Sequence, residues 1–80
     1  MKNAYIRNRL ADLKERVELQ EDHCELSRLA LVERAGICTV DQIADGWLES
    51  EINQIRQEVA EIKSLCDQIK LLEHLLKNAE

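Results

Sequence analysis

Five side chains in this sequence could bind a metal ion or act as a nucleophile and its base: His23, Cys24, Cys38, Cys66 and His74. Structural zinc sites take such ligands in pairs at short spacing, as in CxxC or HxxxH. The sequence has no such pair, and the adjacent His23 and Cys24 would point about 100° apart on a helix. We therefore expect no metal and no cofactor, and we interpret the cysteines as small apolar core residues.

Catalysis by a cysteine and a histidine needs the two groups within hydrogen-bond distance inside a pocket. Cys66 and His74 are eight positions apart in the sequence, about two helical turns, which is too far for direct contact. The sequence also lacks a glycine-rich phosphate loop, and a small helical protein offers little concave volume for a substrate. These observations predict that the chain is not an enzyme.

The composition indicates which elements hold these side chains. The 80 residues include two glycines, no proline and no phenylalanine, and 45% of them are hydrophobic. Such a chain is too apolar to be disordered, and good helix formers dominate it. Tyr5 and Trp47 are the only aromatic residues, so a core must be built from leucine, isoleucine and valine, as in coiled coils. We predict a single all-α domain over 1–80.

Apolar residues recur at helical spacing in two segments, which predicts one helix over about 3–35 and another over about 39–78. A short link would let the two apolar stripes pack against each other as an antiparallel αα-hairpin. The predicted core of this hairpin comprises Ile6, Leu10, Leu13, Val17, Ile55, Val59, Ile62, Cys66 and Ile69.

The link, predicted over about 36–38, is flanked by residues that end and begin helices. Gly36 suits the left-handed position that follows a helix. Thr39 and Gln42 have the spacing of a capping box, and Cys38 with Ile43 could form a hydrophobic staple across it. A glycine within a helix costs about 1 kcal/mol relative to alanine. An alternative is therefore a break near Gly46, which would give three helices.

A reversal near residue 37 would place residue i opposite residue 75 − i, because both helices rise equally per residue. Val17 then faces Val59, and Leu13 faces Ile62 of the second stripe. Two polar residues, Gln20 and Ser27, stand on the first stripe. Ser27 would lie near Leu48. Such polar residues are either tolerated at the edge of the stripe or fix the register or the oligomeric state.

Two helices alone leave apolar side chains uncovered, and these are the candidate interface residues. On the far side of the first helix they are Leu19, Leu26, Leu29 and Ala30, and after the link Trp47. At the end of the second helix they are Leu72, Leu75 and Leu76, of which the last two would extend beyond the start of the first helix. We expect them to be covered by a second copy, giving a four-helix bundle, or by the helices of another protein.

The net charge of −5 disfavours broad binding to nucleic acids or anionic membranes. The charge is uneven: residues 1–18 hold five bases and three acids, whereas residues 41–61 hold six acids and one base, Arg56. No apolar run approaches the roughly 20 residues of a membrane span, and the charged N-terminus does not match a secretion signal. Together with the odd number of cysteines, these features predict a reduced, cytoplasmic protein.

Two alternatives involve ligands other than proteins. The sequence TVDQIADGWLESEINQI, within 39–56, resembles the first half of a helix-turn-helix, which would imply a small DNA-binding regulator. It departs from that pattern at Leu48, where a turn glycine would be expected, and in the acidic start of the following helix. An oligomer could also bind a small anion such as a nucleotide at helix N-termini. The favoured hypothesis is a non-enzymatic helical adaptor or regulator that acts through helix–helix contact.

Overall fold

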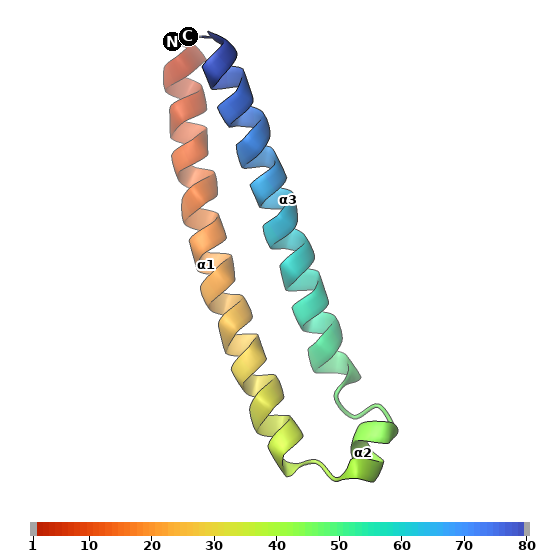
Figure 1. Cartoon of the computed structure of the whole chain (residues 1–80). Coiled ribbons are helices and arrows are strands. Elements are labelled where there is room, and N and C mark those ends of the chain that lie inside the picture. The colour runs from red at the N-terminus through yellow and green to blue at the C-terminus, as the bar shows by residue number, and fades with distance from the viewer. Residues whose placement is uncertain (1, 80) are drawn as a thin grey trace.

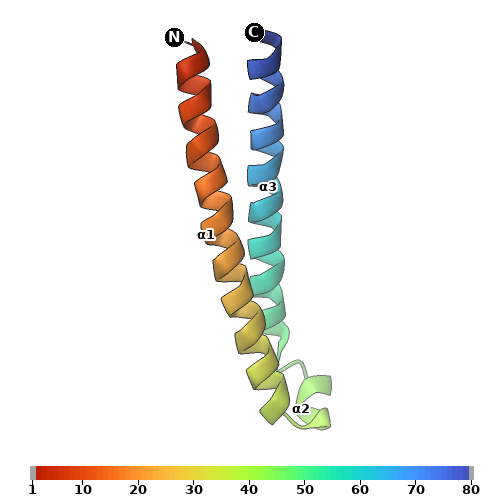
Figure 2. The same ribbon diagram turned by 60° about the vertical axis from the view of Figure 1, so that its left-hand side comes forward.

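The computed structural model describes residues 2–79, and the side chains of residues 3–78. In chain order it contains α1 (Lys2–Ile37), α2 (Val40–Ala44) and α3 (Glu49–Ala79), and these described residues include no strand. The two long helices lie side by side and antiparallel, with both chain ends at one end of the molecule and α2 at the other (Figures 1 and 2). The chain is therefore an all-α helical hairpin, 59 Å long.

α1 runs through the predicted stop at Gly36 and ends at Ile37, where the amide of Cys38 donates to the carbonyl of Arg34 at 3.1 Å. The prediction that Gly36 takes a left-handed conformation is wrong, because the glycine with a positive φ is Gly46, at 87°. A glycine near the end of a helix can remain helical at little cost. The residue type alone therefore did not determine where the helix ends.

The segment after α1 begins with the expected cap. The amide of Gln42 donates to Thr39 Oγ1 at 3.2 Å, and the amide of Thr39 donates to Gln42 Oε1 at 2.9 Å. The helix that this cap starts, α2, lasts only five residues before the chain turns at Gly46. The helix expected over about 39–78 is thus divided, as in the three-helix alternative, because only glycine adopts this backbone conformation readily.

Three contacts between α1 and α3 show that the predicted pairing was wrong. Ser27 Oγ donates to Glu58 Oε1 at 2.7 Å, ten positions beyond the Leu48 that was expected. Near the link, Arg34 Nη1 lies 2.8 Å from Glu51 Oε1, and near the chain ends Lys14 Nζ lies 3.9 Å from Glu73 Oε2. The register moves because α2 and the following turn lengthen the link to residues 38–48.

Within residues 3–78 four apolar side chains are buried. Leu10 and Leu13 belong to the predicted core, and the other two are Leu48 and Leu65. Most of the predicted core lies half-buried at the rim of the helix junction, namely Ile6, Val17, Ile55, Ile62, Cys66 and Ile69. Val59, also predicted as core, is 51% exposed. Conversely, Leu72 and Leu76, expected among the exposed interface residues, are half-buried, because the longer link returns the end of α3 to the start of α1.

Candidate protein-interaction surfaces

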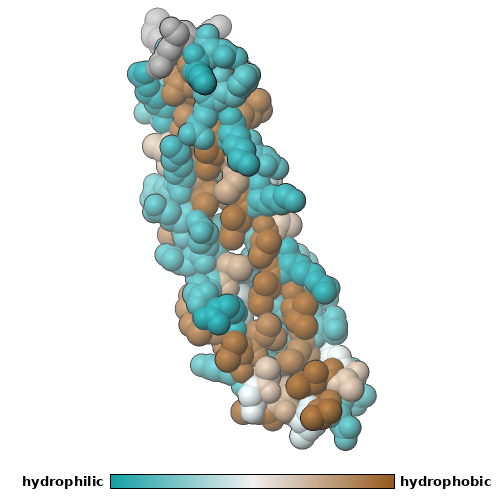
Figure 3. Space-filling view, viewed as in Figure 1, coloured by the Kyte–Doolittle hydropathy of each residue, from teal (hydrophilic) through white to brown (hydrophobic). Residues whose placement is uncertain are grey.

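The link end of the hairpin, which we call the tip (residues 37–49), exposes apolar side chains. Ile37 and Val40 are 84% and 82% exposed, and Ile43 and Trp47 are about half exposed. Apolar atoms gather at this end in the space-filling view (Figure 3). Because water covers these side chains in the isolated chain, the tip is a candidate contact surface.

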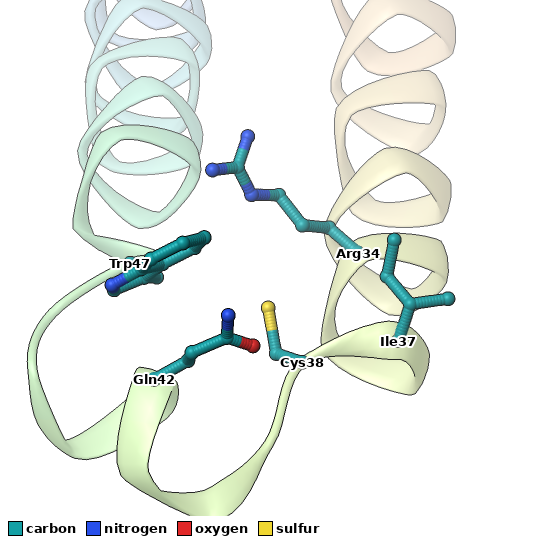
Figure 4. A pocket seen from close by; sticks show the side chains of 5 residues that line it. All are labelled: Arg34, Ile37, Cys38, Gln42 and Trp47. Carbon is teal, nitrogen blue, oxygen red and sulfur yellow. The ribbon is translucent and has the colours of Figure 1, made fainter.

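Trp47 and the end of α1 enclose a shallow hollow of about 280 Å³ at the tip. The side chains of Cys38 and Gln42 lie between the indole ring and α1, and the guanidinium of Arg34 extends toward α3 beside the ring (Figure 4). The amide of Trp47 donates to the carbonyl of Gln42 at 3.2 Å, which ties the backbone of Trp47 to α2. The capping box and the Gly46 turn together therefore position the backbone that carries the half-exposed Trp47 side chain.

The tip is also acidic. Asp41, Asp45 and Glu49 are exposed there. A nearby base, Arg34, forms an ion pair with Glu51, so its charge is partly neutralised. The second oxygen of that carboxylate, Oε2, is buried without a hydrogen-bond partner among the described residues. The charge and the exposed apolar groups suit contact with a basic, partly apolar surface.

The outer face of α1 carries a second apolar group. Leu19 and Leu26, seven residues apart and therefore on one side of the helix, are each more than 60% exposed. The neighbouring Leu29 and Ala30 are exposed as well. Of the expected group at the end of α3, Leu75 is exposed. Tyr5, Val32 and Leu71 are also exposed and were not predicted, because they stand apart from the apolar stripes of the sequence.

A third apolar region follows the junction between α1 and α3. On the face shown in Figure 3, a nearly continuous apolar band runs along this junction. A hollow of about 300 Å³ is lined by Cys24 from α1 and by Val59 and Ile62 from α3, with Glu21 and Glu25 at its edge. Residues predicted as hairpin core thus form the rim of a groove.

A buried polar cluster links the two helices at the middle of the hairpin. Glu58 is 4% exposed and accepts hydrogen bonds from Ser27 Oγ to both oxygens, at 2.7 and 3.0 Å, and from Gln54 Nε2 at 2.9 Å. The pKa of Glu58 is held below its ordinary value, mainly by the hydrogen bond from the Ser27 hydroxyl and then by that from Gln54. Desolvation opposes this shift, and the charge of His23 adds a smaller effect in the same direction as the hydrogen bonds. Sequence analysis missed Glu58, although it lies seven residues before Leu65 on one line of α3.

Substituting Ser27→Ala should remove part of the stability that Glu58 contributes at neutral pH. A carboxylate whose pKa is lowered by folding stabilises the fold above its unfolded pKa, and this contribution is lost as the pH falls through the folded value. Without the Ser27 donor the pKa of Glu58 rises, so the midpoint of acid unfolding, followed by circular dichroism below about pH 5, is expected to move to higher pH. Ser64→Ala, at an exposed position of α3, is the matched control, and an equal shift in both variants would contradict the role of the cluster.

The residues considered for metal binding and catalysis are dispersed. Cys24, Cys38 and Cys66 are free thiols. Across the described part of the chain, no group of three or more histidine, cysteine or acidic residues is placed to hold a metal ion. His74 Nε2 lies 3.0 Å from Nδ2 of Asn78, on the exposed side of α3. In residues 2–79 there is also no helix with the length and apolar character needed to cross a membrane.

The segment within 39–56 that resembles a helix-turn-helix forms α2, the Gly46 turn and the first turns of α3. The helix that would read DNA starts with exposed Glu49, and the one base within 39–56, Arg56, donates from Nη1 to Asn53 Oδ1 at 3.3 Å. Phosphate contact requires positive charge at this position, so the electrostatics of the segment oppose DNA binding.

The candidate contact surfaces are the tip, the outer face of α1 and the groove along the helix junction. Their geometry suits contact with other helices. Comparison of the chain with protein families, with curated proteins and with solved structures finds no match.

Proposed function

We propose that this chain is a non-enzymatic helical module that acts through protein–protein contact, as an adaptor or regulator. The observation that carries the proposal is the imbalance between buried and exposed apolar side chains. Among the described residues, four apolar side chains are buried, whereas twelve large hydrophobic side chains are exposed. A soluble monomer rarely exposes large contiguous apolar patches unless they bind something.

The surface area supports the same proposal. The chain exposes 6211 Å², whereas a compact monomer of its 9.3 kDa mass would expose about 5,000 Å². The excess arises because the hairpin is 59 Å long but only 16 by 12 Å across. Two helices can cover only one side of each other, so further helices are needed to cover the rest.

The outer face of α1 is the surface that we assign to a target protein. Leu19 and Leu26 project from a long helix, an arrangement typical of helix-on-helix recognition. The acidic residues of the tip, including Asp41 and Asp45, would steer a target with a basic surface and speed its association.

A pulldown with the tagged chain tests this function. The unmodified chain is expected to retain one protein in stoichiometric amount, and Leu26→Glu to reduce that binding at least tenfold, since it places a charge in the apolar contact. Gln57→Glu, which adds the same charge at an exposed position of α3, should bind as the parent does. Circular dichroism should show equal helix content in all three chains.

Two results would contradict this proposal or part of it. If no protein is retained, and if duplex DNA is instead shifted in a gel and released by Arg56→Ala, the chain is a DNA-binding regulator and the proposed function is wrong. Equal pulldown by Leu26→Glu and the parent would remove the outer face of α1 from the binding surface.

A further inference from the structure

We propose that a second copy of the chain covers the groove between α1 and α3 in an antiparallel orientation, with the acidic tip of each protomer beside the basic N-terminal half of the other. This inference rests on the proposed function and names its first partner. It uses a different surface from the outer face of α1, so the two proposals can fail independently.

The groove is bordered by two apolar rows, which we call the seam. The α3 row consists of Ile52, Val59 and Cys66, and the α1 row of Val17, Cys24 and Leu31; within each row the residues are seven positions apart and lie along one line of the helix. The rows flank one groove, because Cys24 and Val59 line the same hollow. All six side chains are partly exposed, Val59 most of all at 51%.

A pair of such rows is half of the core of a four-helix bundle. Placing two seams face to face in antiparallel orientation brings Val17 opposite Leu31 of the other copy and sets Cys24 and Val59 each near its own counterpart. A face 59 Å long and 16 Å wide can bury about 800 Å² per chain, the amount in a standard stable interface. A second copy therefore has both the apolar pattern and the area that the groove requires.

The charge distribution selects the antiparallel orientation over the parallel one. Residues 41–61 contain six acids and one base, a net charge of −5, and lie at the tip and in the adjoining part of α3. Residues 1–18 contain five bases and three acids, a net charge of +2, and belong to the other end of the hairpin. A parallel dimer would place two segments of charge −5 side by side. An antiparallel dimer places each at the level of a basic segment, which is favourable at ordinary salt.

The mass of the chain in solution is the first test. Light scattering is expected to give twice the 9.3 kDa mass of one chain. Val59→Lys, which puts a charge in the centre of the seam, should weaken dimerisation at least a hundredfold, and Gln57→Lys, at an exposed position of α3, should not. Because Val59 is half exposed in the hairpin, the helix content of a Val59→Lys monomer should persist.

The orientation is tested by distances between spin labels. In a chain with Cys24→Ala and Cys66→Ala, Cys38 carries the only label, near the tip. Two such labels are expected to lie roughly 40 Å apart in the antiparallel dimer, from the helical rise of 1.5 Å per residue, and within roughly 20 Å in a parallel dimer. A second labelled chain has all three native cysteines replaced and carries its label at Asn8→Cys, near the end of the hairpin opposite the tip. Its two labels should also give the long distance.

Three results would overturn the inference. A mass of one chain at high micromolar concentration excludes the dimer, and target binding by that monomer would leave the proposed function intact. A short distance between Cys38 labels shows a parallel dimer. Loss of the dimer in Leu26→Glu, with retention in Val59→Lys, moves self-association to the outer face of α1.

Discussion

Replacing Leu13 by alanine is expected to lower the free energy of unfolding by about 3 kcal/mol, the largest effect of any single substitution considered for this chain. Among the residues whose side chains are described, Leu13 is the one with an exposed fraction of 0%, and three other apolar residues are buried with it. Removing it leaves a cavity that so small a core cannot refill. Urea unfolding followed by circular dichroism, at one fixed protein concentration because association also contributes stability, measures the loss.

Leu19→Ala is the matched control for Leu13→Ala. It removes the same atoms from the same helix, but at a side chain that is 62% exposed. Its free energy of unfolding should stay within about 0.5 kcal/mol of the parent value. Equal losses in the two variants would contradict the assignment of Leu13 to the interior of the hairpin and Leu19 to its surface.

Substituting alanine for the two glycines should change stability in opposite directions. Gly46→Ala is expected to lower the free energy of unfolding by about 1–2 kcal/mol, because the φ of 87° is unfavourable for a residue with a Cβ atom. Steric contact is not the cause, since the added Cβ would lie 3.4 Å from Glu49 Cγ, an ordinary distance. Gly36→Ala is expected to raise stability by about 0.5–1 kcal/mol, because Gly36 is helical and an added Cβ meets nothing within 4 Å.

The same unfolding measurement compares the two glycine variants, and their difference of about 2 kcal/mol is large enough to measure reliably. If both substitutions stabilise the chain, α2 and α3 form one continuous helix in solution. The tip would then lack the turn that presents Trp47, and the longer second helix would restore the register first predicted from the sequence.

The exposed surfaces have distinct consequences for how the protein works. In the proposed dimer the second copy would cover the groove between the long helices, and the outer face of α1 would stay exposed to the proposed target. Trp47 and the acidic residues of the tip would lie at both ends of an antiparallel dimer. Such an assembly is a symmetric rod with two equivalent outer faces, which would allow it to hold two copies of a target.

Local sequence determined the elements. The composition and the helical spacing of apolar residues predicted an all-α hairpin, and the structure confirms it. The capping box at Thr39 and Gln42 is present, and the break considered near Gly46 is where the backbone turns. These features depend on contacts within four or five residues, so their residue types are sufficient to indicate them.

The tertiary structure decided which residues of the two helices meet. An apolar stripe with steps of three and four residues matches a second stripe again after a slip of seven or ten positions, so spacing alone could not choose between registers. The choice follows from the length of the link, which α2 and the Gly46 turn extend to residue 48. That length buries Leu65 and Glu58 and leaves Val59 exposed.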